Sequence, residues 1–336
     1  MSNIKEVAKV AGVSPSTVSS VNNDNSSISK KTKDKVWRAI EELNYSPNEI
    51  AKALINSKSY TITLLIDLDD TKSFQNPFFY EIMHGIENYC STKGFSLMVA
   101  NLNTNLKRNN IIEWLVKSKR TEGIILPTSI LTPHLVKKLK LLDVPFVAIG
   151  EINYFEENIS WVDIDNHRGT KKAVYELLNM GYSKIAFIGK DDTKDFSKRR
   201  VEGYIKALEE RNIKIEHNLI IECDNNKIDG YKKTKEMFNQ GLIFDAIICG
   251  NDNLSIGVIK AIKEQSLSVP KDIGIISYDS RRIATLIDPE VTTVDVDLFE
   301  MGFQASKMLF NKIDDKNCKN QGLLVGTEII KRNTTK

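Results

Sequence analysis

Polar and aromatic side chains that suit recognition of a small molecule stand close to several apolar runs of the sequence. They are Phe78, Phe79, Arg200, Asn251 and Asp279. The planar guanidinium of an arginine and a carboxylate suit neighbouring sugar hydroxyls, and a phenylalanine ring supplies an apolar wall. The alternative is structural, because Asn and Asp after a strand often only form a turn or cap the next helix. Asp252 is predicted to be such a cap.

A second group of residues, near the amino terminus, has the small polar types that contact phosphates and base edges of nucleic acid. Its members are Ser14, Pro15, Ser16, Thr17, Ser20 and Asn23. Helical spacing turns Val18 and Val21 inward, away from this group. The alternative is an ordinary helical core, in which short helices joined by a glycine turn also occur.

Three short helices are expected to position this second group. Asn3 and Glu6 predict a capping box for a first helix, and Gly12 ends it. Ser14 is expected to cap a second helix that runs to about residue 22, and so short a connection predicts a helix-turn-helix. A third helix should follow Ser29. Its buried stripe is predicted to consist of Val36, Ile40 and Leu43.

Residues 47–59 predict a hinge helix and linker between this head and the rest of the chain. A helix this short is marginal alone, so its stability must come from a partner. The alternative is a solvated linker between domains.

From residue 61 onward, short apolar runs alternate with amphipathic stretches. Strands are predicted at 61–66, 95–100, 123–127, 145–150, 161–164, 184–189, 219–222, 244–249 and 273–278. Helices are predicted at 78–93, 107–119, 133–142, 167–181, 196–212, 229–240 and 252–266. Two consecutive sets of strand-helix units predict an α/β body of two doubly wound parallel sheets. Ligands of such sheets bind beyond the carboxyl ends of the strands, which places the predicted ligand site in a cleft between the two halves.

Composition restricts the class of protein. The chain has 336 residues and a net charge of +3, and residues 1–60 carry this whole excess, with nine Lys or Arg against six Asp or Glu. A basic end on a neutral body is expected where only that end meets phosphate. The four cysteines are far apart, no apolar run has the length of a membrane span, and no export signal is recognised. We therefore expect a cytoplasmic protein without metal, cofactor or membrane partner.

Catalytic motifs provide little support for an enzyme. The chain lacks a phosphate-binding G-x-x-x-x-G-K-[ST] loop, a G-x-S-x-G nucleophile turn and a histidine pair with metal spacing. No catalytic residue is therefore assigned, and we expect the protein not to be an enzyme. A solute-binding protein is compatible with the body alone, but the basic head argues against it.

The head closely resembles that of the lactose-repressor and galactose-repressor (LacI/GalR) family of bacterial transcription regulators. The resemblance rests on IKEVAKVAGVSPSTVS and on KKTKDKVWRAIEELNYSPN, and it extends from residue 4 to about residue 332. It implies a homodimeric repressor that binds double-stranded operator DNA under the control of a small-molecule sugar effector. Arg200, Asn251 and Asp279 match the positions that hydrogen-bond the effector, Leu54 the leucine that enters the minor groove, and Lys52 a residue near phosphate.

The resemblance also implies domain boundaries. The DNA-binding domain would comprise residues 1–46, and the body would have a periplasmic-binding-protein-like core of two subdomains. The first subdomain would consist of 60–160 and 292–320, and the second of 161–291 and 321–333. The chain would cross between them near 160, 291 and 320, with a helix at 298–313 in the first half and 323–331 paired in the second.

Some features narrow the expected effector and operator. DTKSFQNPFF and PFVAIG resemble the maltose-operon branch, which favours maltose or another α-glucoside. Glu151 stands where that branch usually has Lys, Asn225 replaces an aromatic that often stacks on the effector, and Ser20 replaces an Arg of the reading helix. The alternative within the family is a global carbon-catabolite-type regulator that also responds to a phosphorylated carrier protein.

Overall fold

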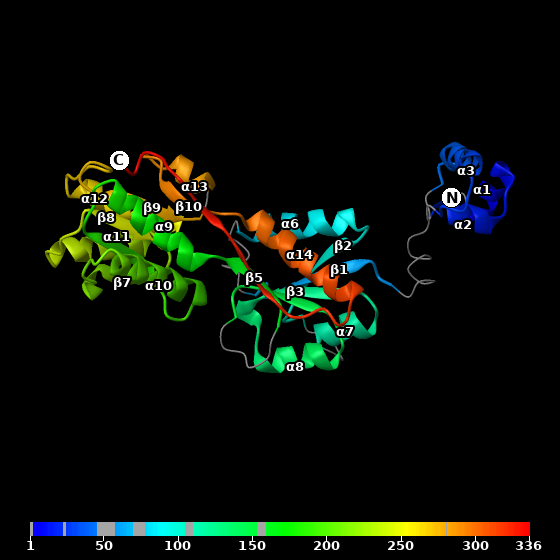
Figure 1. Ribbon diagram of the computed structural model, residues 1–336, viewed down its shortest axis with the longest axis horizontal. Coiled ribbons are helices and arrows are strands. Elements are labelled where there is room, and N and C mark those ends of the chain that lie inside the picture. Colours follow the sequence, from blue (N-terminus) through cyan, green and yellow to red (C-terminus); the bar gives the residue numbers. More distant parts are fainter. Residues whose placement is uncertain are drawn as a thin grey trace. The chain divides into compact units, whose positions relative to one another are not determined.

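The computed structural model describes residues 3–22, 25–45, 58–69, 78–104, 110–152, 159–279 and 281–336. The chain divides into two units, a head unit, Met1–Ser59, and a body unit, Tyr60–Lys336 (Figure 1). Each unit has its own apolar core, and each is described separately.

The described part of the head unit contains three helices, α1 (Ile4–Ala11), α2 (Pro15–Asn22) and α3 (Lys30–Glu42). The predicted signals act as expected at both ends of α1. Asn3 and Glu6 form a capping box, and Gly12 ends the helix in the left-handed conformation with φ of 65°. Ser29 caps α3 by accepting from the backbone N–H of Thr32.

The core of the head is formed by apolar residues of all three helices. Its buried members are Val7, Ala8, Ala11, Val18, Val21, Val36, Ala39 and Ile40. Leu43 was predicted to be buried with Val36 and Ile40, but it is only half-buried at the edge of this core. The inward orientation predicted for Val18 and Val21 is confirmed, so α2 directs its polar side chains away from the core.

The described residues of the body unit form two six-stranded sheets. The first sheet has the order β11 (Gly322–Val325), β5 (Trp161–Ile164), β4 (Phe146–Ile149), β3 (Gly123–Pro127), β1 (Thr61–Ile66) and β2 (Ser96–Asn101). The second has the order β12 (Thr327–Ile330), β10 (Thr292–Val296), β9 (Gly274–Tyr278), β8 (Ala246–Cys249), β6 (Ile185–Lys190) and β7 (Ile220–Glu222). Neighbouring strands are parallel except β12, which is antiparallel to β10. The predicted α/β class with doubly wound sheets is confirmed.

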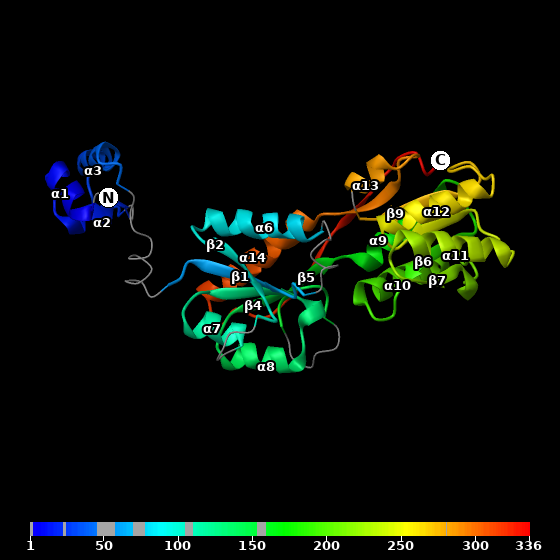
Figure 2. The ribbon, with the colours of Figure 1, turned by 180° about the vertical axis from the view of Figure 1, so that it is seen from behind.

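Helices cover both faces of each sheet (Figures 1 and 2). Those of the first half are α6 (Phe78–Thr92), α7 (Ile111–Lys117), α8 (Pro133–Leu141) and α14 (Leu298–Asp314), with the 3-10 turn η1 (Thr128–Ile130). Those of the second half are α9 (Asn166–Asn179), α10 (Asp195–Glu210), α11 (Lys227–Asn239), α12 (Asp252–Glu264) and α13 (Arg281–Leu286), with the turn η2 (His217–Leu219). Helices α6 and α14 cover one face of the first sheet, and α7 and α8 cover the other (Figure 1).

Three strand assignments predicted from the sequence are wrong. Strand β5 pairs with β4 in the first sheet, although residue 161 was expected to open the second half. Strand β10 pairs with β9 in the second sheet, although residue 292 was expected to return to the first half. Within 323–331, β12 pairs in the second sheet as expected, whereas β11 pairs with β5 in the first. The chain therefore passes between the halves just after residues 164, 296 and 325. The sequence did not predict these positions, because the sheet to which a strand belongs depends on distant partners that a short apolar run does not specify.

Two glycines bring α6 and α14 into close backbone contact. A Cβ atom at Gly85 would lie 2.0 Å from the carbonyl oxygen of Phe299, and one at Gly302 would lie 2.2 Å from that of Ile82. Because each glycine faces the backbone of the other helix, any larger side chain at either position must push the two helices apart.

A continuous apolar cluster, here called the shared core, extends from the first sheet to the second. It contains Ile62 and Ile125 of the first sheet, Phe187 and Ile276 of the second, and Met301 of α14. Two smaller clusters fill the opposite faces, one under α7 and α8 and one under α11 and α12. The two sheets are therefore parts of one folded body.

Candidate functional site

The exposed end of α2 presents the small polar residues that the sequence singled out. Ser14 Oγ accepts from the backbone N–H of Thr17 at 3.2 Å and lies 2.7 Å from Ser16 Oγ. Ser14, Pro15 and Ser16 are exposed, while Thr17 and Ser20 are half-buried. Because the apolar side of α2 is held in the head core, these hydroxyl groups form a fixed polar surface.

Several predicted site residues lie outside the residues that the structure describes. They are Asn23, Lys52 and Leu54, together with residues 47–57 of the predicted hinge helix. The same holds for the side chain of Phe78 at the start of α6. Phe79 is half-buried, packs against the shared core, and makes an edge contact with Tyr80 at 6.2 Å between ring centroids.

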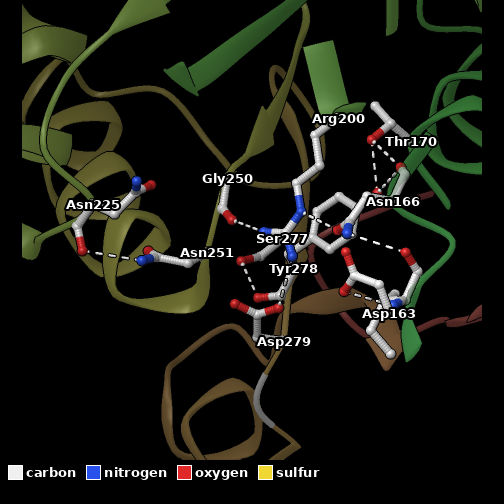
Figure 3. Close-up of polar contacts among 11 residues, drawn as sticks. Asp163, Asn166, Thr170, Arg200, Asn225, Gly250, Asn251, Ser277, Tyr278 and Asp279 are labelled. Carbon is white, nitrogen blue, oxygen red and sulfur yellow. Dashed lines mark hydrogen bonds and ion pairs between the residues drawn. The ribbon is translucent and has the colours of Figure 1, made fainter. Parts of the chain in front are cut away.

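Arg200 is the centre of a buried polar cluster, here called the Arg200 cluster. Its Nε donates to Asn166 Oδ1 at 2.8 Å, one terminal nitrogen donates to the carbonyl of Gly250, and the other lies 3.4 Å from Asp279 Oδ1. Only 5% of Arg200 and 8% of Asp279 is exposed. Figure 3 shows the guanidinium between Gly250 and Asn166, with Asp279 beyond it. Gly250 and Asp279 follow β8 and β9, so the cluster occupies the carboxyl ends of the second sheet.

Tyr278 and Asn166 fix the orientation of the guanidinium. The Arg200 guanidinium carbon lies 3.7 Å from the centroid of the Tyr278 ring. The Tyr278 hydroxyl donates to the carbonyl of Asn166 and lies 2.7 Å from the Thr170 hydroxyl. The Asn166 amide donates to the carbonyl of Ile164, which directs its oxygen towards Arg200. Arg200 is therefore held by groups from three other segments of the chain.

Asn251 has a structural role at the start of α12. Its Oδ1 accepts from the backbone N–H of Leu254, and its Nδ2 donates to the carbonyl of Asn225 at 3.0 Å (Figure 3). Asn251 is therefore the cap of α12, and the prediction that Asp252 caps this helix is wrong. Asp252 is the first residue of the helix, because the chain reaches helical geometry one residue earlier than a cap at Asp252 would require.

Sequence reasoning identified Arg200 and Asp279 but missed Asn166. Asn166 follows β5 and Tyr278 ends β9. The signal that singled out Asp279, a polar residue after an apolar run, was therefore also present at Asn166. The pairing itself was not visible, since Asn166 and Arg200 are 34 positions apart.

Two carboxyl groups near Arg200 hold their protons more tightly than usual. Burial raises the pKa of Asp279 from 3.8 to about 7, against the opposing effect of the Arg200 charge, and nearby Asp252 adds to the rise. Burial also raises the pKa of Asp163 from 3.8 to about 6, although it accepts from the backbone N–H groups of Glu151 and Ile164.

Stability should consequently fall as pH rises from about 4 to 7. Over that range the folded chain keeps a proton on Asp279 that the unfolded chain has lost, so each rise in pH favours unfolding. Across this pH range the titration of Asp279 should lower the free energy of unfolding by about 4 kcal/mol in total, at roughly 1.4 kcal/mol per pKa unit. Asp279→Asn should flatten this part of the profile in urea unfolding at stepped pH. The exposed control Asp314→Asn should keep the wild-type slope, and equal slopes for wild type and Asp279→Asn would contradict the assignment.

A bidentate ion pair connects the two halves of the body beside this cluster. Arg199 of α10 donates from Nε and Nη2 to the two carboxylate oxygens of Glu151, both at 2.9 Å. Arg199 also pairs with Glu202 at 2.8 Å. Glu151 follows β4 of the first sheet, whereas α10 belongs to the second half. The carboxyl ends of the two sheets therefore meet at this point.

Comparison with known proteins identifies the family. A sequence profile described as "Bacterial regulatory proteins, lacI family" matches residues 3–48. A second, described as "Periplasmic binding proteins and sugar binding domain of LacI family", matches residues 62–332. The chain belongs to the LacI family. The resemblance stated from the head sequence is thereby confirmed.

This LacI-family chain matches known repressors over its full length. It is 32% identical over 338 residues to the HTH-type transcriptional repressor PurR of Histophilus somni (strain 2336), covering 100% of this chain and 99% of that protein. The lac repressor dimer bound to operator and the anti-inducer ONPF has a TM-score of 0.75 at 25% identity and 99% coverage of both chains. A complex of the regulator CelR with cellobiose has a TM-score of 0.73 at 25% identity, covering 99% of this chain and 100% of that one. The chain is accordingly a DNA-binding transcriptional repressor with a sugar-binding type of core.

Two kinds of feature are absent from the described residues of this LacI-family chain. No helix among them is long and apolar enough to cross a membrane. Within the same residues, no group of three or more His, Cys, Asp or Glu side chains has the arrangement of a metal site.

Proposed function

We propose that the chain is a homodimeric, cytoplasmic repressor whose affinity for a near-palindromic operator falls when a small sugar binds at the Arg200 cluster. The observation that carries this proposal is the ordered guanidinium of Arg200 beside Asp279, at the carboxyl ends of strands, in a chain whose head is a helix-turn-helix. A forked donor beside a carboxylate matches adjacent sugar hydroxyls, which both donate and accept hydrogen bonds. The homodimer is proposed by analogy with the operator-bound lac repressor dimer.

The proposed control works through the relative positions of the two halves. Arg200 belongs to the second half, and its neighbour Arg199 contacts Glu151 of the first. A ligand that binds better to one arrangement of the halves shifts the population towards it, and operator affinity changes by the same coupling free energy. In this proposal the shift reaches the operator through residues 47–59, with Leu54 in the minor groove and Lys52 near phosphate.

The identity of the sugar is a separate question. Maltose or another α-glucoside is supported by the two sequence stretches DTKSFQNPFF and PFVAIG. Cellobiose, also a glucose disaccharide, is bound in the CelR complex. We therefore propose a glucose disaccharide and place maltose first among the compounds to be tested.

The experiment is an operator-release titration. An operator duplex selected from random sequence is bound to the purified chain, and fluorescence anisotropy follows its release as maltose, cellobiose, ribose, free nucleobases or a control polyol is added. We expect one sugar to lower operator affinity about 10-fold to 100-fold, the usual range of allosteric coupling. Release by a nucleobase alone would overturn the sugar assignment, and a monomer in analytical ultracentrifugation would overturn the homodimer.

Non-enzymatic function is part of the proposal. Its support is that the relatives above are transcriptional regulators and that no catalytic motif was recognised in the sequence. Turnover of glycosides by the purified chain would contradict it.

The reading surface of α2 leads to a separate prediction about base preference. In the proposed complex Ser14, Pro15, Ser16, Thr17, Ser20 and Asn23 face the operator. Ser20→Arg should add a preference for guanine of about 1–3 kcal/mol at one position of each half-site, because arginine binds the guanine edge bidentately. Competition binding with single-base operator variants measures this preference. Ser26→Arg, at an exposed position between α2 and α3, adds the same charge and should tighten binding to all duplexes alike.

A further inference from the structure

The two adjacent arginines of α10 are already paired with carboxylates. Glu151 takes both nitrogens that Arg199 directs towards the first half, and Glu202 takes a third. Arg200 uses its donors on Asn166, Gly250 and Asp279. Every nitrogen of the two guanidinium groups thus has an acceptor, and an anion that uses their remaining N–H groups must lie beside a carboxylate already bound there.

Further negative charge surrounds the same place. The Asp163 carboxylate accepts from the backbone N–H of Glu151 at 2.9 Å, and its pKa is influenced by Glu151 and by Arg200. Asp252 is close enough to Asp279 to raise its pKa. Around the two arginines the described residues thus supply carboxyl groups from the first sheet and from the second. These groups are Glu151, Asp163, Glu202, Asp252 and Asp279.

We propose that Glu151, together with Asp163, restricts the Arg200 cluster to uncharged ligands and rejects phosphorylated or carboxylated ones. The proposal rests on the proposed function, since it takes the Arg200 cluster as the ligand site. Hydroxyl groups can bind between paired charges, because they donate to a carboxylate and accept from a guanidinium at the same time. A phosphate monoester is mostly a dianion at neutral pH and then only accepts hydrogen bonds, so beside either arginine it lies close to a carboxylate to which it cannot donate. Repulsion at about 5 Å and an effective dielectric constant of about 20 corresponds to roughly 100-fold weaker binding.

The first test compares matched neutral and phosphorylated probes on the full-length chain by calorimetric titration. The pairs are glucose with glucose 6-phosphate, maltose with maltose 6′-phosphate, and adenosine with AMP. We expect the neutral member of a binding pair to bind about 100-fold more tightly than its phosphorylated partner. A phosphorylated member that binds as tightly as its neutral partner overturns the proposal.

The second test needs no knowledge of the natural ligand. The melting temperature of the protein is measured as inorganic phosphate is added at constant ionic strength. Wild type should show no saturable rise, whereas Glu151→Lys should gain one, because it removes a carboxylate and leaves Arg199 with an unpaired face. Glu202→Lys is the matched control, since it makes the same charge change at the more exposed partner of Arg199. Saturable stabilisation of wild type, or equal responses of the two variants, would count against the proposal.

A conservative variant covers the case in which Glu151→Lys does not fold. Glu151→Gln keeps the size of the side chain and removes only its charge, so it should bind phosphate more tightly than wild type does. The Glu202→Gln control should behave as wild type. A Glu151→Gln variant that excludes phosphate as strongly as wild type would refute the assigned role of Glu151.

Operator release separates this inference from the proposed function. A neutral sugar that binds tightly without changing operator affinity would refute the control mechanism and leave charge selection intact. A sugar phosphate that binds and releases the operator would do the reverse.

Discussion

Arg200→Ala is expected to abolish the response of operator binding to the effector and to reduce the unfolding free energy of the body by about 3–5 kcal/mol. The variant removes the hydrogen-bond donor of Asn166 and of Gly250. It also leaves the buried Asp279 carboxyl group without its cation among the described contacts. The head and its core are untouched, so operator affinity without effector should remain close to that of wild type. Urea unfolding and operator-release titration measure the two effects.

The neighbouring arginine is the control for this prediction. Arg199→Ala removes a cation from the same helix, but that side chain is 31% exposed and pairs with Glu151 and Glu202. Its cost should be about 1 kcal/mol or less. The Arg200→Ala loss should also be greater at pH 8 than at pH 5, because Asp279 is charged only at the higher pH. An Arg200→Ala protein that still releases the operator at the wild-type effector concentration would refute the assignment of this site.

A double variant tests whether the stability loss arises from the stranded carboxylate. Asp279→Asn in the Arg200→Ala background removes the unpaired charge and should recover part of the lost stability. Strict additivity of the two single changes would mean that the pair at 3.4 Å contributes little.

Gly302→Ala is expected to cost about 2–3 kcal/mol of unfolding free energy through overpacking. The added methyl group would meet the carbonyl oxygen of Ile82 at 2.2 Å, and backbone cannot rotate away as a side chain can. Helices α6 and α14 must therefore separate, which exposes apolar surface of the shared core. Urea unfolding of the full chain measures the loss.

Gly326→Ala is the matched control, since a Cβ atom at Gly326 has no other heavy atom within 4 Å. That change should leave stability within about 0.5 kcal/mol of wild type. Gly85→Ala, on the other helix of the pair, should cost about as much as Gly302→Ala. Losses of equal size at Gly302 and Gly326 would contradict the packing argument.

Local signals predicted most of the elements. Strands β1, β3 and β5 begin and end at the expected residues, because each is a short apolar run with clear boundaries. The capping box of α1 and the left-handed Gly12 are also local features, and both were predicted. Sheet membership was not, since β5 and β10 find their neighbours through pairings between distant segments.

The candidate site divides in the same way. Arg200 and Asp279 were identified by residue type and by the family resemblance. Their contact, between residues 79 positions apart, required the fold. Asn251 shows the limit of reasoning from residue type. It follows a strand, as a ligand-binding residue would, but its side chain caps α12. The Glu151–Arg199 pair was not predicted. Nothing in the sequence indicates that the end of β4, which Glu151 follows, lies beside α10, which carries Arg199.

The shared core has a consequence for how the repressor denatures. Its residues connect both sheets, and the ends of β5 and β10 and the start of α14, where the chain crosses, contribute Ile164, Val296 and Leu298. Neither half can melt without opening the apolar surface of the other, so the body should lose its structure in one cooperative event. The head, with a core formed only by its own helices, should melt independently and give calorimetry a second endotherm.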